Sequence, residues 1–336
     1  MTLRVGVIGA GWVAGARYLP VLARLADVEV VVADSSGGRS EAYASDTVTV
    51  AANPAELLDR SPDLVIVCTP PDRHLEPVLD ALSAGAHVLC EKPLAASLAE
   101  AERLFAAADD AGRMLCPAHN FLWSSSMRRA RRMIRDAGDT SLVLATQFSS
   151  DDRRLPSWSD RLPGGLLADE IPHLLYLMRD LLGGRLEVLD VHARWEGRRS
   201  EPRHTLVRFE GPKGLGQATI VFGTPISEWH VSAVCPSSVV DVDLFRDVAV
   251  STRSDGAHGA ADVARLSTRV AAGHLTGFAA AGARLAAGRQ FWGHDGLVRD
   301  MISAVEGGGS PPVDRESALD VVAAAEKIVE ALGAGD

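Results

Sequence analysis

Lys92 is the residue of this sequence whose type and position point most directly to chemistry. The chain has thirty-one arginines and only three lysines, so a plain positive charge is usually supplied by arginine. Lys92 follows an apolar, strand-like run, forms a charged pair with Glu91, and precedes Pro93, whose peptide bond has a realistic cis option. A lysine can be brought toward neutrality and exchange a proton, whereas arginine stays protonated. The pattern predicts a positioned proton-transfer group; the alternative is a solvated lysine after a strand.

A second pair of residues able to transfer protons lies in the segment 164–173, Gly-Gly-Leu-Leu-Ala-Asp-Glu-Ile-Pro-His. Asp169 and His173 are four positions apart, so on a helix they share one face. Histidine titrates near neutral pH, and a carboxylate can orient a hydroxyl group or raise the basicity of its neighbour. The spacing therefore favours acid/base chemistry; the alternative is a solvated polar face with an ion pair.

A glycine-rich segment near the beginning of the chain predicts a dinucleotide site. Residues 9–14, Gly-Ala-Gly-Trp-Val-Ala, follow a strand-like run and open a helical pattern, and Asp34 ends the next strand-like run. Gly9 permits the tight turn, Gly11 lets a pyrophosphate approach the backbone, and the helix N-terminus offers N–H groups. Asp34 would accept both ribose hydroxyls and repel a 2′-phosphate, which favours NAD(H). Arg39 nearby leaves NADP(H) possible.

Another cofactor segment follows the third predicted strand at residues 68–74, Cys-Thr-Pro-Pro-Asp-Arg-His. The carboxyl ends of parallel strands border the ligand crevice of such a sheet. We therefore expect Thr69 and Pro70 to touch the nicotinamide ribose or the pyrophosphate, and His74 to begin the next helix. The full set of expected cofactor-binding residues is Gly9, Gly11, Trp12, Val13, Asp34, Arg39, Thr69, Pro70, His74, Glu91 and Lys92.

The elements that position these residues alternate between strand and helix over the first third of the chain. Strands are predicted at 3–8, 28–33, 64–68, 87–90 and 114–118, with helices at 14–25, after residue 74 and from Ser97, which begins a capping-box spacing. This alternation predicts an α/β Rossmann domain with a parallel, doubly wound sheet over residues 1–121.

The pattern changes in the rest of the chain. Helices are predicted at 125–137, 164–182, 262–286, 295–306 and 315–332, with a strand at 142–148 and five or six strand-like runs between 186 and 251, including a hairpin turn at 210–214. Residues 122–313 therefore predict an α+β substrate and oligomerisation domain with a large, mostly antiparallel open sheet. The C-terminal helix, within residues 314–336, is expected to pack back on the first domain.

Composition excludes several classes of protein. The 336 residues are 47% hydrophobic and 23% charged, which is typical of a globular protein, and the net charge of −10 makes nucleic acid or an anionic membrane a poor partner. The four cysteines are widely spaced, so neither a metal site nor a disulfide framework is indicated. Without a signal peptide or an apolar run long enough to span a bilayer, the protein is expected to be cytoplasmic.

Four segments together make the chain resemble the Gfo/Idh/MocA oxidoreductase family. They are Gly-Ala-Gly at 9–11, Cys-Thr-Pro-Pro-Asp-Arg-His at 68–74, His-Val-Leu-Cys-Glu-Lys-Pro at 87–93, and Gly-Gly-x3-Asp-x3-His at 164–173. The resemblance covers essentially the whole chain. It implies a Rossmann domain followed by an α+β domain whose open sheet face commonly mediates homodimers or homotetramers.

The resemblance also implies an activity. Hydride would pass between nicotinamide and a secondary alcohol or ketone of a sugar, cyclitol or sugar derivative, with Lys92 and His173 as acid/base groups and Asp169 in support. The expected substrate-binding residues are Lys92, Asn120, Arg153, Trp158, Asp169 and His173, with Arg154, Trp229 and His230 as further contacts. Other activities left open are reduction of a thiazoline-type imine, NAD-assisted glycoside cleavage, and a non-catalytic NAD(P)-binding sensor.

The sequence departs from the family pattern at four positions. Position 172 is Pro where Gly is usual, 176 is Tyr where Asp is frequent, 18 is Tyr where the first helix often has His, and 170 is Glu. Pro172 lacks an N–H and is expected only in a first helical turn or at a kink. Glu170 is expected either to meet a cationic or polyhydroxyl substrate or to be solvated.

Overall fold

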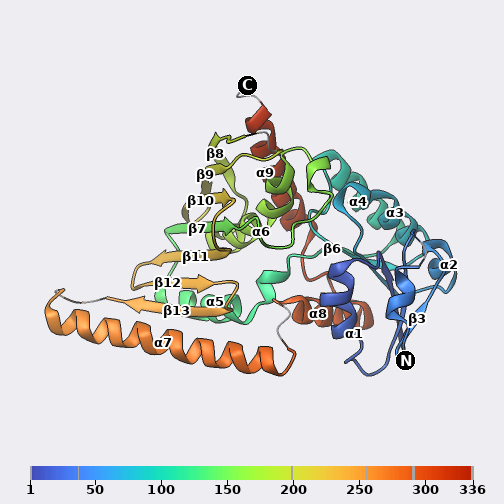
Figure 1. Ribbon diagram of the computed structural model, residues 1–336, viewed down its shortest axis with the longest axis horizontal. Helices are drawn as coiled ribbons and strands as arrows, with labels where there is room; N and C mark the ends of the chain where they lie inside the picture. Colours follow the sequence, from blue (N-terminus) through green and yellow to red (C-terminus); the bar gives the residue numbers. More distant parts are fainter. Residues whose placement is uncertain are drawn as a thin grey trace. The chain divides into compact units, whose positions relative to one another are not determined.

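The chain forms two compact units, each built from two separate stretches of sequence. The computed structural model describes residues 2–36, 38–197, 200–254, 256, 258–289 and 292–333. The first unit comprises Met1–His119 and His294–Glu326, and the second comprises Asn120–Gly293 and Lys327–Asp336 (Figure 1). Helix α8 (His294–Gly307) thus lies in the first unit, although the sequence placed it within a domain of 122–313. The reason is its apolar face, which packs against the first helical segment of that unit.

The first unit contains a six-stranded parallel sheet in the order β3-β2-β1-β4-β5-β6. Its strands are β1 (Leu3–Ile8), β2 (Val28–Ala33), β3 (Val48–Val50), β4 (Leu64–Val67), β5 (His87–Cys90) and β6 (Leu115–Pro117). The predicted Rossmann domain is confirmed, since this order is that of a doubly wound dinucleotide-binding sheet. The short strand β3 and helix α2 (Pro54–Asp59) were missed, because each is too brief to show a clear periodicity.

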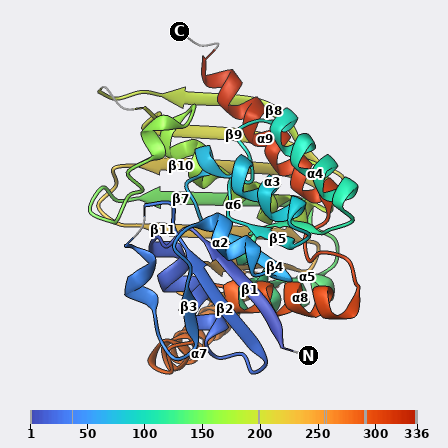
Figure 2. The same cartoon turned by 90° about the vertical axis from the view of Figure 1, so that its right-hand side faces the viewer.

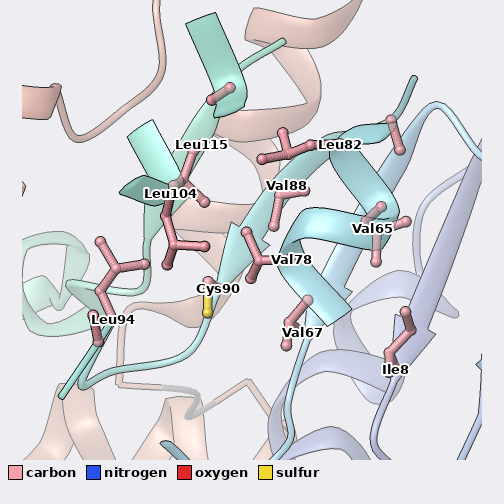
Figure 3. Close-up of a cluster of buried hydrophobic side chains, with 14 of the residues drawn as sticks. Ile8, Val65, Val67, Val78, Leu82, Val88, Cys90, Leu94, Leu104 and Leu115 are labelled. Atoms are coloured by element: carbon pink, nitrogen blue, oxygen red, sulfur yellow. The ribbon is translucent and has the colours of Figure 1, made fainter. Parts of the chain in front are cut away.

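Helices cover both faces of this sheet. On one face, Val65, Val67 and Val88 form a hydrophobic cluster with side chains of the neighbouring helices (Figure 3). The helices contributing to it are α2, α3 (Leu75–Ser83), α4 (Leu98–Ala111) and α9 (Arg315–Gly333). On the other face, where Val7 and Ile66 are fully buried, lie η1 (Ala14–Tyr18), α1 (Leu19–Leu22) and α8 (Figure 1). The helix predicted at 14–25 is therefore a π-helical turn followed by a short α-helix.

The four cysteines are all free and buried. Burial raises the pKa of the Cys116 thiol to about 12 and raises those of Cys68 and Cys90 well above their usual value. Since the thiolate is the reactive form, these three side chains are core residues rather than nucleophiles.

The second unit contains a seven-stranded sheet in the order β13-β12-β11-β7-β10-β9-β8, antiparallel except for the pair β7 and β10. Its strands are β7 (Leu142–Ser149), β8 (Glu187–Arg194), β9 (His204–Gly211), β10 (Gly214–Phe222), β11 (Glu228–Cys235), β12 (Ser238–Asp243) and β13 (Val248–Arg253). Figure 2 shows β8, β9, β10, β7 and β11 side by side in that order. The predicted, mostly antiparallel sheet is confirmed.

Helices α5 (Ser125–Ala137), α6 (Gly165–Leu182) and α7 (Ala260–Ala286) flank this second sheet. Helices α5 and α6 cover the face that carries Val143, Ala218 and Val231. The long helix α7 lies along the edge strand β13 (Figure 1). Leu144 and Leu215 alternate with the buried residues and are 40% and 52% exposed on the opposite face. Among the described residues, no helix combines the length and apolar character needed to cross a membrane.

Candidate active site

The glycine turn after β1 is shaped by close contact with the neighbouring strand. Gly9 has φ +99°, and a Cβ placed there would lie 2.8 Å from the carbonyl carbon of Cys68. Only glycine fits such a position without strain. Gly11, in contrast, has open space where a Cβ would extend. The turn therefore leaves its backbone open to a bulky ligand group, as a bound pyrophosphate requires.

Asp34 stands where β2 ends, with its carboxylate already oriented. One oxygen accepts a hydrogen bond from Ala10 N at 2.9 Å, and the other accepts from Ser36 N at 2.8 Å and from the Ser36 hydroxyl. Burial alone would raise the pKa of Asp34, but these hydrogen bonds and the charge of Arg39 lower it. The side chain is thus a fixed carboxylate at the edge of the glycine turn.

The loops that follow β4 and β5 are tied together by His74. Its fully buried ring lies 2.9 Å from the carbonyl oxygen of Thr69 through Nε2 and 2.9 Å from that of Pro93 through Nδ1. Burial lowers the pKa of this imidazole, although both carbonyl groups favour its protonated form. His74 was expected among the cofactor-binding residues, and its side chain holds together the two loops that carry Thr69 and Lys92.

The backbone at Lys92 is held by a buried polar cluster around Glu91. The Lys92–Pro93 peptide is cis, and Lys92 N donates to Glu91 Oε2 at 3.2 Å. The other oxygen of Glu91 accepts from the Tyr18 hydroxyl at 2.6 Å and lies 3.6 Å from His294 Nε2. Burial would raise the pKa of Glu91, but hydrogen bonds from His294 and Tyr18 and the charge of Lys92 lower it. Glu91 is therefore a buried anion directly before Lys92 in the chain.

We expect Glu91→Gln to destabilise the protein by roughly 2 kcal/mol at neutral pH, because it removes a charged hydrogen-bond acceptor. Because the pKa of Glu91 is lower in the folded than in the unfolded protein, its carboxylate stabilises the fold above about pH 4.3. This stabilisation is lost as the pH falls through the folded-state pKa. Urea unfolding at several pH values should therefore show the difference between wild type and variant shrinking in acid. The exposed Glu102→Gln on α4 is the control. A pH-independent difference would contradict the prediction.

Helix α6 carries the second set of predicted groups. It begins after Gly164, whose φ is +79°, and Asp169 and His173 both lie on it, 6% and 8% exposed. The solvated polar face considered from the sequence is therefore wrong. Pro172 lies inside α6, beyond the first turn, where it removes the hydrogen bond to the Ala168 carbonyl. The helix continues through it to Leu182, so the shared face of Asp169 and His173 is kept.

His173 is enclosed by aromatic side chains of its own unit. Its ring centroid lies 5.1 Å from that of Phe121, 5.0 Å from that of Trp229 and 5.6 Å from that of Tyr176. Its Nδ1 lies 2.7 Å from the Tyr176 hydroxyl oxygen, which is 3.4 Å from Asn120 Oδ1. Asn120 and Trp229, both predicted to contact substrate, are thus gathered around His173.

Three other predicted contacts lie on β11 and in the loop after β7. His230 follows Trp229 in β11, so it points to the opposite face of the sheet, where Nε2 lies 3.1 Å from Glu228. Arg154 is exposed, and Trp158 is half-buried at the start of the short helix η5 (Ser159–Arg161).

Glu170 is buried, whereas the sequence suggested that it either meets a substrate or is solvated. It is 3% exposed, forms an ion pair with Arg153, and accepts hydrogen bonds from Gln147 and from the Ser149 hydroxyl, the latter at 3.1 Å. Burial lowers the pKa of Arg153, and the charge of Asp169 raises it. Arg153 therefore connects the loop after β7 to α6.

Sequence reasoning missed His294 and gave Tyr176 no role. Each acts through a partner that is distant along the chain, as in the bond from Phe121 N to Tyr176 Oη, which spans 55 residues. The departures at positions 18 and 176 were visible signals, since each places a hydroxyl group where the family pattern has an ionisable side chain.

The parallel sheet, the glycine turn and the oriented Asp34 define a dinucleotide-binding protein of the Rossmann class. A family model described as "Oxidoreductase family, NAD-binding Rossmann fold" matches residues 3–119. The chain is 30% identical over 283 residues to inositol 2-dehydrogenase 1 of Saccharopolyspora erythraea, covering 81% of this chain and 82% of that protein. It is 34% identical over 181 residues to the uncharacterized oxidoreductase YdgJ of Escherichia coli. That match covers 52% of this chain and 51% of YdgJ, so the chain spans about half the length of several curated relatives.

Solved structures show the same fold over the whole chain. WlbA dehydrogenase of Bordetella pertussis, in complex with NADH and UDP-GlcNAcA, has a TM-score of 0.80 at 17% identity, covering 100% of this chain and 96% of that one. KijD10, a 3-ketoreductase of Actinomadura kijaniata in complex with NADP and TDP-benzene, has a TM-score of 0.78 at 22% identity, covering 98% of each chain. The chain therefore belongs to the Gfo/Idh/MocA family of oxidoreductases, which confirms the resemblance found in its sequence.

Proposed function

We propose that this protein transfers a hydride between nicotinamide and a secondary alcohol or ketone of a sugar, cyclitol or related polyol, and that it prefers NAD(H). The observation that carries the proposal is the Rossmann unit in which the glycine turn, the fixed carboxylate of Asp34 and the Glu91–Lys92 pair all follow strand ends of one parallel sheet. Ligands of such sheets bind at the carboxyl ends of the strands.

The expected cofactor contacts fit that ligand. The backbone around Gly11 has room for a bulky group such as the pyrophosphate, and the fixed carboxylate of Asp34 supports its role as the acceptor for ribose hydroxyls. Five further residues stay in the proposed site along its wall and rim: Trp12, Val13, Arg39, Thr69 and Pro70. When bound, the nicotinamide accepts or gives the hydride, so the protein has to move one proton and hold the reacting carbon.

The residues assigned to proton movement are Lys92 and His173. His173 exchanges the hydroxyl proton at Nε2, and the role assigned to the Lys92 ammonium group is to stabilise negative charge as it develops on the substrate. Asp169 orients the hydroxyl group, and Asn120, Arg153 and Trp158 are proposed to line the substrate side. The names of the relatives, an inositol 2-dehydrogenase and a 3-ketoreductase among them, support a polyol or keto-sugar substrate.

The activity is tested by following reduced nicotinamide absorbance with a panel of cyclitols, sugars and sugar nucleotides, each with NAD(H) and NADP(H). A steady change with at least one polyol or keto-sugar is expected. Glycoside cleavage without net absorbance change, or reaction only with imines, would contradict the proposal.

Self-association is proposed through the open sheet face with Leu144 and Leu215, and light scattering of Leu144→Glu tests it.

Asp34→Ser should reverse the cofactor preference. Loss of two hydrogen bonds from ribose hydroxyls to a carboxylate, at about 1.5 kcal/mol each, should lower kcat/KM with NAD roughly 100-fold. Removal of the negative charge should raise kcat/KM with NADP, and Arg39→Ala in the same background should cancel that gain. Initial rates with both cofactors measure these effects. A fall with both cofactors would indicate a damaged glycine turn and would count against the assignment.

A further inference from the structure

We propose that Tyr176 is a positioning residue that fixes neutral His173 in the tautomer with the proton on Nδ1, which leaves the lone pair on Nε2. The inference rests on the proposed function for its catalytic meaning, because Nε2 is the nitrogen assigned to exchange the substrate proton. The arrangement itself depends only on hydrogen-bond donors and acceptors within the second unit.

The first step concerns the backbone of Phe121. Its N–H group lies 3.2 Å from the Tyr176 hydroxyl oxygen, and a peptide N–H can only donate. One lone pair of the phenol oxygen is therefore engaged. The phenol itself has a single proton to give, and two neighbours compete for it, Asn120 Oδ1 at 3.4 Å and His173 Nδ1 at 2.7 Å.

The second step is the orientation of the Asn120 amide. Its Nδ2 donates to the carbonyl oxygen of Trp292 at 2.9 Å, so Oδ1 is the atom that faces Tyr176. An amide oxygen can only accept a hydrogen bond. Asn120 is 3% exposed, and a buried acceptor facing another oxygen without a proton between them is costly.

These two steps decide the direction of the third hydrogen bond. If the phenol donates to Asn120 Oδ1, then Phe121 N–H and His173 Nδ1–H both donate to the phenol oxygen, and each of these three contacts joins a donor to an acceptor. If the phenol donates to His173 instead, Asn120 Oδ1 and the phenol oxygen face each other unprotonated. The arrangement therefore favours the Nδ1–H tautomer of His173. The neutral hydroxyl group of Tyr176 selects this tautomer by accepting the Nδ1–H hydrogen bond, at a position where the family pattern frequently has Asp.

The packing around the imidazole keeps this choice in place. Tyr176 is 2% exposed and lies three positions after His173 on α6, so the two side chains are neighbours along the helix. The rings of Phe121 and Trp229 contact the imidazole on other sides. A rotation of His173 that would exchange its two nitrogens requires these rings to move.

The test is ¹⁵N NMR of the full-length protein labelled at its ten histidines, with the His173 signals assigned through His173→Gln. The wild type should show a protonated Nδ1 and an unprotonated Nε2. Tyr176→Phe should lose this pattern, and Tyr176→Asp, which restores an acceptor, should regain it. Asn120→Leu should release the phenol proton toward Nδ1 and shift His173 to the Nε2–H form, which provides a second route if the Phe variant does not fold.

Kinetics supply the functional arm. Tyr176→Phe should lower kcat about tenfold or more with the KM for NAD within about twofold, and Tyr176→Asp should recover part of kcat. A wild-type Nε2–H tautomer, or an unchanged Nδ1–H tautomer in Tyr176→Phe, would overturn the inference. If the tautomer follows the prediction but no polyol or keto-sugar turns over, the positioning role stands and the proposed function fails.

Discussion

Lys92→Met is expected to lower kcat about 1,000-fold while leaving the KM for NAD within about threefold. Methionine keeps most of the length of the side chain but cannot donate a hydrogen bond to a developing alkoxide. Glu91, Tyr18 and His294 hold the backbone that carries Lys92, so the substitution should leave this cluster in place. Steady-state rates, with nicotinamide binding followed separately by fluorescence, measure the two effects.

The chain offers a matched control for this substitution. Lys213 is 43% exposed and forms a surface ion pair with Asp139 at 2.9 Å. Lys213→Met removes the same functional group from a solvated site, so kcat should stay close to the wild-type value. A Lys92→Met variant that keeps near-normal kcat with a genuine substrate would remove Lys92 from the mechanism.

Arg153→Ala is expected to destabilise the protein by about 3 kcal/mol, a large share of the net stability of a typical domain. Among the described residues, the change leaves the buried carboxylate of Glu170 with the neutral polar groups of Gln147 and Ser149 as its hydrogen-bond partners. An unpaired buried charge is far more costly than the loss of the attraction between the two partners. Urea unfolding of wild type and variant measures the change.

A double-mutant cycle separates this cost from a general effect of truncation. Glu170→Gln removes the charge, so Arg153→Ala should cost much less in the Glu170→Gln background than in the wild type. Arg154→Ala, at the next position and exposed, is the control and should change stability little. Additive effects of the two substitutions would show that the ion pair is not coupled in the folded protein.

Local patterns predicted the first unit well. The glycine turn, Asp34 and Lys92 each follow a strand that a short apolar run defines, and parallel strands bring their carboxyl ends to one edge. The shared face of Asp169 and His173 was also predictable, because helical spacing survives the proline between them. These parts of the site depend on residues close together in sequence.

The rest of the site depends on contacts that no local pattern reports. Tyr18 and Glu91 are separated by 73 residues, and Arg153 reaches Glu170 from a loop without regular periodicity. From sequence alone, a charged residue in an apolar helix is predicted to be solvated or functional, because its partner is not known. Glu170 therefore looked like a substrate contact, whereas it anchors a loop.

The route of the chain through the two units has a consequence for synthesis and for evolution. The chain crosses from one unit to the other after His119, after Gly293 and after Glu326. Ala318 and Val322 complete the core around β4 and β5, so a ribosome delivers the last part of that core only after most of the second unit has been made. A single genetic crossover therefore cannot exchange either unit whole, because each unit is made of two separate stretches of the chain.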